Sequence, residues 1–248
     1  PITYCINGWT MDISTKAIAL KSVDYGENDK IILLYSLEYG KISVRAKGIK
    51  KPKAKLKFCQ EPFCLGVYEL AAGHGYYVLK TCQQLESFYS LREDIVCFYG
   101  GCVVLECLAA LQPEEPDARL FVEALKTFDA LTAGVNAYIA VLYFLLQFLK
   151  QSGYELNFAA CSVCGDNSQL YLDPAVGGVV CKQCKGEGAI ALSAGTGNLL
   201  KLVSSMTSDK LANIRVPDAV SKEAVHSLSS YIAVAVQRLK SATEFIRL

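Results

Sequence analysis

Short β-prone runs of apolar residues, separated by turn residues, occupy the first third of the chain. These runs cover residues 15–24, 29–38, 41–49, 62–70 and 76–85, with turn residues such as Gly26 and Gly40 between them. Short strands that follow one another at roughly 10–12 residues, with no early helix, are typical of a small β-barrel. The pattern therefore favours a five-stranded OB-fold over residues 14–86.

From about residue 87 the apolar positions recur at helical spacing instead. Helices are predicted over residues 88–111, 117–132, 135–152, 194–207 and 218–246, and Asp117, Asn136 and Asp218 are candidate helix starts. The longest apolar run, residues 137–149, is interrupted by Gln147 and is too short to cross a bilayer. It indicates a buried helix.

Together these patterns predict an α+β protein with several domains. Residues 87–158 and 188–248 are expected to form an α-helical domain, into which residues 159–187 are inserted as a cysteine-rich finger. The chain starts at Pro1, and residues 1–13 are expected to be an extension or a cloning remnant. No signal peptide is recognisable, which favours a cytoplasmic location.

Four of the 11 cysteines form two pairs with the spacing of metal ligands. Cys161 and Cys164 make the first CxxC pair, and Cys181 and Cys184 make the second, sixteen residues further on. Two such pairs complete a tetrahedral shell of thiolates suited to Zn²⁺, with no position left for water or substrate. We expect a structural zinc ion; redox dithiols or plain structural cysteines are the alternatives. The other cysteines lie mostly among apolar residues, as in a reducing compartment.

Positive charge is concentrated in one segment of a nearly neutral chain. The net charge is +1, but residues 41–57 contain eight cations and no acid, which leaves 17 basic and 24 acidic residues elsewhere. A basic segment of this density, within a predicted OB-fold, favours contact with nucleic-acid phosphates, although lysine runs are also common on ordinary solvated surfaces. The candidate DNA-binding residues are Lys41, Arg45, Lys47, Lys50, Lys51, Lys53, Lys55 and Lys57.

Aromatic side chains in the barrel region are candidates for stacking on bases. They are Tyr25, Tyr35, Tyr39, Phe58, Tyr68, Tyr76 and Tyr77, and for any one of them core packing is the simpler interpretation. Catalytic motifs are not found: there is no phosphate-binding loop, and the two histidines, His74 and His226, have no partner set. The sequence predicts a binding protein and not an enzyme.

The opening block TKAIALKSVDYGENDKIILLYSLEYGKISVRAKGIKKPKAKL and the two CxxC pairs resemble the RecO family of DNA repair proteins over residues 14–248. The resemblance implies an OB-fold, a helical domain with an inserted zinc finger, and binding of single- and double-stranded DNA. It also implies strand annealing and loading of RecA, together with a RecR-like protein, onto DNA covered by single-stranded DNA-binding protein. That last protein is expected to contact the helical domain through its C-terminal tail. The resemblance implies a bacterial protein of the cytoplasm and nucleoid.

Two other functions fit the same residues. A zinc-containing RNA-binding or ribosome-associated OB-fold protein would use the same basic segment, since single-stranded RNA also stacks on aromatic residues. A scaffold that binds a partner through its helices would need the lysines only for solubility.

Overall fold

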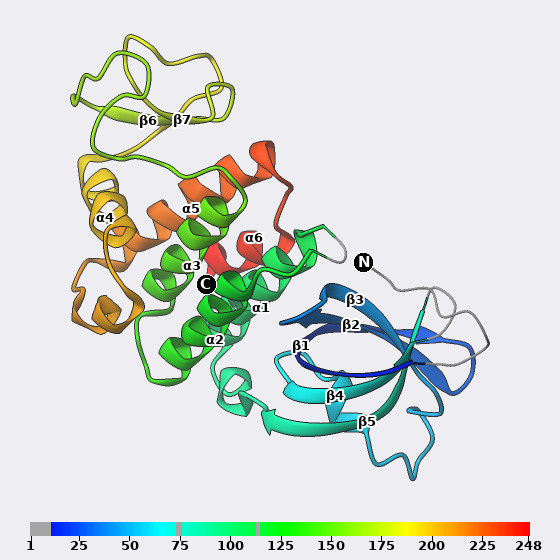
Figure 1. Cartoon of the computed structure of the whole chain (residues 1–248). Helices are drawn as coiled ribbons and strands as arrows, with labels where there is room; N and C mark the ends of the chain where they lie inside the picture. The colour runs from blue at the N-terminus through cyan, green and yellow to red at the C-terminus, as the bar shows by residue number, and fades with distance from the viewer. Residues whose placement is uncertain (1–10, 73–75, 113–114) are drawn as a thin grey trace. The chain divides into compact units, whose positions relative to one another are not determined.

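The computed structural model describes residues 11–72, 76–112 and 115–248, and it confirms the predicted α+β organisation (Figure 1). The chain forms two compact units. The first contains the N-terminal strands together with residues 111–118, and the second contains residues 88–110 and 119–248.

The first unit is a closed five-stranded barrel. Its strands are β1 (Met11–Tyr25), β2 (Asp29–Ser36), β3 (Gly40–Ala46), β4 (Leu65–Ala72) and β5 (Tyr77–Glu86). They follow one another around the barrel in the order β1-β2-β3-β5-β4, and β3 and β5 are the parallel pair that closes it. This is the strand arrangement expected for an OB-type barrel.

The first strand differs from its prediction in two ways. It begins at Met11, so residues 11–13, which we expected to precede the barrel, pair with β4. The usual alternation of buried and exposed side chains along a strand also fails over residues 17–20, which are all buried, because the pairing register shifts between Ala19 and Lys21. Such a bulge bends a strand and lets consecutive side chains face the core.

Apolar side chains from all five strands fill the barrel, among them Ile32, Leu34, Val44 and Leu70. A short 3-10 helix that we did not predict, η1 (Lys57–Gln60), contacts β1 and β5 and contributes the buried Cys59 to this core. The barrel is therefore closed and filled by side chains, so any ligand must bind on its outer surface.

The second unit is built around a nearly fully buried helix, α3 (Ala137–Gln151), as the apolar run predicted. The other helices are α1 (Ile95–Ala110), α2 (Ala118–Thr132), α4 (Ala194–Ser204), α5 (Asp218–Ala235) and α6 (Lys240–Arg247), with 3-10 turns η2 (Tyr89–Arg92) and η3 (Ser208–Asn213). Helix α3 packs against α1, α4 and α5. The predicted cap is also confirmed, because the Asn136 side chain accepts the backbone N–H groups of Tyr138 and Ile139.

The predicted helix over residues 218–246 is wrong in its middle. Helix α5 ends at Ala235, and α6 starts at Lys240 after the buried Leu239. The side chain of Glu106, on α1, accepts the N–H groups of Lys240 and Ser241 at 2.9 and 2.8 Å. A carboxylate from a distant helix thus satisfies the free amides of a new helix start, which apolar periodicity cannot reveal.

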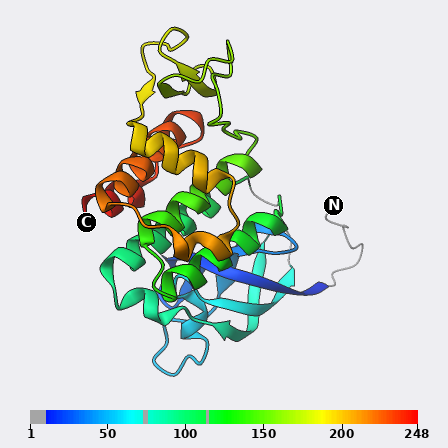
Figure 2. The ribbon, with the colours of Figure 1, turned by 90° about the vertical axis from the view of Figure 1, so that its left-hand side faces the viewer.

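The cysteine-rich insertion forms a small three-stranded sheet at one end of the second unit (Figures 1 and 2). Its strands are β6 (Leu170–Asp173), β7 (Gly178–Cys181) and β8 (Ile190–Ala191), in the order β7-β6-β8. Gly177 turns the β6–β7 hairpin with a φ of 73°, a conformation that glycine adopts without steric cost.

Candidate nucleic-acid interface and metal centre

The basic segment runs from strand β3 into the loop that leads to η1. Six of its cations are exposed: Lys47, Lys50, Lys51, Lys53, Lys55 and Lys57. Among the described residues, only Lys50 of these six takes part in an ion pair, with Asp24 at 2.7 Å. The other five lysines make no ion pair with any carboxylate of the described residues, although Lys47 is near enough to Asp29 to contribute to lowering the pKa of that carboxyl.

The basic loop, residues 47–57, is fixed at both ends by apolar residues. Ile49 is buried in the barrel core, and Leu56 packs against the same core just before η1. The N–H of Lys50 donates to the carbonyl of Asn28 at 3.0 Å, which ties the loop to the β1–β2 turn. Between these fixed ends the backbone of the loop projects from the barrel (Figure 1).

The two cations on strand β3 are less available than the sequence suggested. Lys41 is half-buried, and burial together with nearby Lys21 lowers the pKa of its ammonium group. The Arg45 guanidinium donates twice to Oδ2 of Asp29, from Nε at 2.9 Å and from Nη2 at 2.7 Å. The structure therefore separates the eight predicted residues into a loop set and two strand residues with other neighbours.

Asp29 is a residue that the sequence analysis overlooked. Besides holding Arg45, it accepts the N–H of Gly48 at 2.7 Å through Oδ1. The Gly48 N–H and the Arg45 guanidinium together lower the pKa of this carboxyl. Asp29 thus fixes both Arg45, the last cation of strand β3, and the first turn of the basic loop. The signal available in the sequence was an acid at the start of a strand that precedes the run of cations.

Burial divides the seven aromatic candidates. Tyr35 and Tyr68 are fully buried and serve the core. Phe58 and Tyr77 are partly buried against it. The exposed side chains are Tyr25 at 50%, Tyr39 at 36% and Tyr76 at 53%. His226 lies exposed on α5, whereas His74 lies outside the described residues.

The two CxxC pairs meet at one point, as their spacing predicted. The sulfur atoms of Cys161, Cys164, Cys181 and Cys184 all lie within 4.8 Å of one another, and the Cys164 and Cys181 sulfurs are 3.6 Å apart. Four sulfurs around one zinc ion at its usual bond length stand about 3.8 Å from each other. The four cysteines therefore fit a tetrahedral metal centre.

Backbone geometry prepares this centre for thiolate ligands. Gly165 has a φ of 79° and donates its N–H to the Cys161 carbonyl at 2.9 Å, which closes the first knuckle. Burial disfavours the Cys161 thiolate, but backbone N–H groups, including those of Cys164 and Cys181, outweigh it and lower its pKa to about 6. Amide hydrogen bonds to sulfur favour the deprotonated form that binds metal.

A buried carboxylate that the sequence analysis also overlooked supports the second knuckle. Asp173 accepts the N–H of Gly186 at 2.7 Å through Oδ2, and those of Ala175 and Val176 through Oδ1. The Gly186 bond is the main reason why the pKa of Asp173 is lowered. This side chain connects the β6–β7 turn to the chain that follows Cys184.

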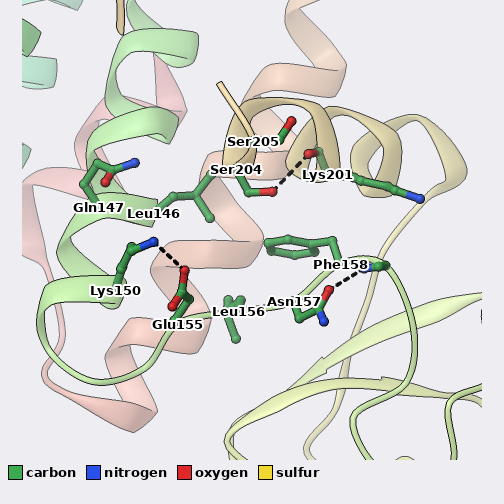
Figure 3. A pocket seen from close by; sticks show the side chains of 11 residues that line it. Leu146, Gln147, Lys150, Glu155, Leu156, Asn157, Phe158, Lys201, Ser204 and Ser205 are labelled. Carbon is green, nitrogen blue, oxygen red and sulfur yellow. Dashed lines mark hydrogen bonds and ion pairs between the residues drawn. The ribbon is translucent and has the colours of Figure 1, made fainter. Parts of the chain in front are cut away.

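A cavity of about 570 Å³ lies in the second unit beside the insertion, between the end of α3 and α4 (Figure 3). Leu146, Leu156 and Phe158 give it an apolar lining, while Lys150 and Lys201 are the cations at its edge. Lys150 pairs with Glu155 at 2.7 Å. The cavity therefore combines apolar contact with one cation, Lys201, that makes no ion pair among the described residues.

The fold and these two sites define a class of protein: an OB-type barrel with a basic surface loop, followed by a helical unit with a four-cysteine metal centre. The family models for the N-terminal and C-terminal parts of recombination protein O match residues 11–88 and 92–243. The chain belongs to the RecO family of DNA repair proteins.

Individual relatives agree with this assignment over nearly the whole chain. The chain is 31% identical to "DNA repair protein RecO" of Clostridium novyi over 242 residues, which cover 96% of this chain and 94% of that protein. It is 28% identical to the protein of that name from Clostridium perfringens, with 95% and 97% covered. The corresponding protein of Bacillus pumilus is 27% identical, with 89% and 88% covered.

In the described part of the chain, none of the helices has the length and apolar character that a membrane span requires.

Proposed function

We propose that this protein is a DNA-binding recombination mediator, which anneals complementary single strands and helps to load a RecA-type recombinase during DNA repair. The observation that carries the proposal is the basic loop: five exposed lysines outside any ion pair of the described residues, held on the surface of an OB-type barrel. Membership of a DNA repair family supports DNA as the polyanion.

The proposed mechanism is electrostatic and needs no catalytic group. Two single strands repel each other through their phosphates, and pairing of their bases runs downhill once this repulsion is reduced. Lysines that contact phosphate release condensed counterions and lower the repulsion between the strands. We therefore propose a protein that acts as a binder and not as an enzyme, in the cytoplasm at the nucleoid.

We propose Zn²⁺ as the ion of the metal centre, held by Cys161, Cys164, Cys181 and Cys184. All four ligands come from the protein, so the ion would supply folding free energy and would leave no open coordination position. The ion would then fix the insertion in shape and take no part in contact with DNA.

Strand annealing is the direct test of the proposal. Two complementary oligonucleotides, one with a fluorophore and one with a quencher, are mixed with the protein without any nucleotide, first bare and then coated with single-stranded DNA-binding protein. In both cases we expect faster quenching than in the matching control without this protein. An unchanged rate would contradict the annealing function.

We also propose a RecR-like protein and single-stranded DNA-binding protein as partners. For the C-terminal tail of the latter, the cavity edged by Lys150 and Lys201 is a suitable place, because it offers apolar contact and positive charge together. Binding of a fluorescent tail peptide should weaken in Lys201→Glu and remain unchanged in Lys210→Glu, an exposed lysine outside the cavity lining. Equal binding by both variants would place the tail elsewhere.

RNA binding remains the second candidate function, because a basic OB-type barrel does not by itself distinguish the two backbones. Competition between DNA and RNA oligonucleotides of the same sequence distinguishes them. We expect DNA to compete at least as well as RNA, and a strong preference for RNA would favour the alternative.

A further inference from the structure

We propose that Tyr25 and Tyr76, with Arg45 beside them, form a stacking site for an unpaired base of single-stranded nucleic acid. This inference rests on the proposed function and deepens it. The basic loop would hold the backbone of the strand, and the aromatic site would hold its bases.

The strand register brings these side chains to one face of the barrel. Tyr25 is paired with Asp29 across β1 and β2, and Arg45 is paired with Val78 across β3 and β5. Directly paired residues project on the same side of a sheet, and residues two positions apart on a strand do so as well. Ile31, two positions after Asp29, is paired with Arg45, so Tyr25 and Arg45 share the outer face of the sheet. Tyr76 lies immediately before β5, two positions before Val78.

Arg45 lies over the Tyr25 ring and is itself held firmly. Its guanidinium carbon lies 4.9 Å from the centre of the Tyr25 ring, within the range of a cation–π contact. Asp29 is the main cause of the raised pKa of the Arg45 guanidinium, and the Tyr25 and Tyr76 hydroxyls are near enough to add smaller charge effects. Because Asp29 accepts two hydrogen bonds from this guanidinium and offsets its charge, Arg45 is better suited to orienting the rings than to neutralising a phosphate.

The two rings are accessible and adjoin the basic loop. Tyr25 is 50% exposed and Tyr76 is 53% exposed, in a barrel where Tyr35 and Tyr68 are fully buried. Asp29, which holds Arg45 over the Tyr25 ring, also accepts the N–H of Gly48 in the basic loop. A strand whose phosphates contact the loop would therefore bring its bases to these rings.

An exposed tyrosine near an arginine is not sufficient evidence of a site, and the chain offers a matched control for this reason. Tyr89 is 64% exposed, and Arg92 lies 6.0 Å from its ring centre. The Tyr89 pair belongs to the second unit and has no lysine-rich loop next to it in sequence. If exposure and a neighbouring arginine were enough, Tyr89 would contribute to binding as much as Tyr25.

The test compares two oligonucleotides of equal length, oligodeoxythymidylate and its abasic counterpart, by fluorescence anisotropy. Stacking contributes only with the first, whereas phosphate contacts contribute with both. We expect the wild-type protein to prefer the thymidylate. Tyr25→Ala should weaken thymidylate binding by about tenfold, and a Tyr25→Ala/Tyr76→Ala double variant by more, with abasic binding unchanged. Tyr25→Phe and Tyr89→Ala should bind both as the wild type does.

The outcomes separate this inference from the proposed function. Equal wild-type affinity for the two oligonucleotides would overturn the stacking site while leaving phosphate binding intact. Binding of neither would overturn the proposed function and the stacking site with it.

A measurement on the unmutated protein avoids any effect on folding: an oligonucleotide with 5-iododeoxyuridine should crosslink to Tyr25 or Tyr76 on irradiation. Crosslinks found only at other residues would also overturn the site.

Discussion

The basic loop follows strand β3, whereas the four-cysteine centre is assembled from residues before β6 and from the end of β7, and the two sites depend on the fold to different degrees. In the centre, the spacing of two CxxC pairs already determines that four sulfurs converge, and the structure brings them within 4.8 Å. In the basic segment, residues 41–57, the sequence determines only that eight cations are close along the chain. Which of them remain available depends on acids from other strands.

Asp24 and Asp29 illustrate the difference between cations that are close along the chain and cations that are available in the fold. Asp24, on β1, pairs with Lys50, and Asp29, on β2, holds Arg45. Neither acid lies within the basic segment, so counting charge along the sequence overestimates the number of cations free to bind phosphate. A metal site requires ligands at a suitable spacing along the chain, whereas the charge of a surface depends on side chains from several strands of the sheet. The two sites should therefore respond differently to substitution.

The largest effect is expected from loss of the metal centre. Replacing Cys181 with serine removes a ligand and leaves three thiolates without a stable ion, and structural zinc sites contribute on the order of 10 kcal/mol to the folding of small fingers. We expect the insertion to unfold in Cys181→Ser and in chelated wild-type protein, seen as loss of amide protection over residues 161–191 in hydrogen exchange. Cys107→Ser, a buried cysteine outside the centre, is the control for general destabilisation. Retained protection after chelation would show that the insertion folds without metal.

Charge reversal of the basic loop should have the next largest effect. Changing Lys50, Lys51, Lys53 and Lys55 to glutamate should weaken single-strand binding at least about a hundredfold at moderate salt, because attraction is replaced by repulsion. For the wild type, six phosphate contacts would give a slope of roughly −4 in log affinity against log salt, and the variant should be much flatter. Anisotropy titrations over a range of salt measure both quantities.

The matched control for that variant makes the same change in net charge elsewhere. Lys126, Lys201, Lys210 and Lys240 are exposed in the second unit, and their reversal to glutamate should leave most of the affinity and the salt slope in place. If both quadruple variants lose binding equally, net charge matters and the position of the loop does not.

Much of the fold could be predicted from local pattern, and the failures have identifiable physical causes. The five strands, the buried helix α3 and the Asn136 cap depend on side chains close in sequence, and all were predicted. The bulge after Ala19 and the break before α6 depend on partners distant in sequence, namely the opposite strand and Glu106. The candidate sites divide in the same way: the metal ligands were predicted, whereas Asp29 and Asp173 were missed because they act on chain segments 13 to 19 residues away.

Asp173 tests whether the metal centre also depends on support beyond its ligands. The Asp173→Asn substitution keeps the size of the side chain but removes the charge that accepts three backbone N–H groups. Hydrogen bonds to a buried charged group contribute roughly 2 kcal/mol, so we expect faster hydrogen exchange in the insertion and weaker metal retention in a chelator competition. The Glu187→Gln variant, at an exposed acid of the same insertion, serves for comparison. Equal metal retention in Asp173→Asn and the wild type would mean that the four sulfurs alone set the stability of the centre.

The smallest effect on stability is expected from substitution of Asp29, whose carboxylate supports the basic loop as Asp173 supports the metal centre. Its carboxyl has a lowered pKa because it accepts the Gly48 N–H and the Arg45 guanidinium, so its contribution to stability is present above the pKa of the unfolded chain, about 4. That contribution is lost as the pH falls through the lowered value in the folded protein. The Gly48 amide resonance should therefore titrate with a midpoint below 3.8, and this step should be missing in Asp29→Asn but present in Glu27→Gln. Because the amide reports only its own neighbourhood, acid release of metal from the other unit does not disturb the reading. A Gly48 midpoint at or above 3.8 would mean that Asp29 does not hold the loop, and the lysines would then owe their positions to Ile49 and Leu56 alone.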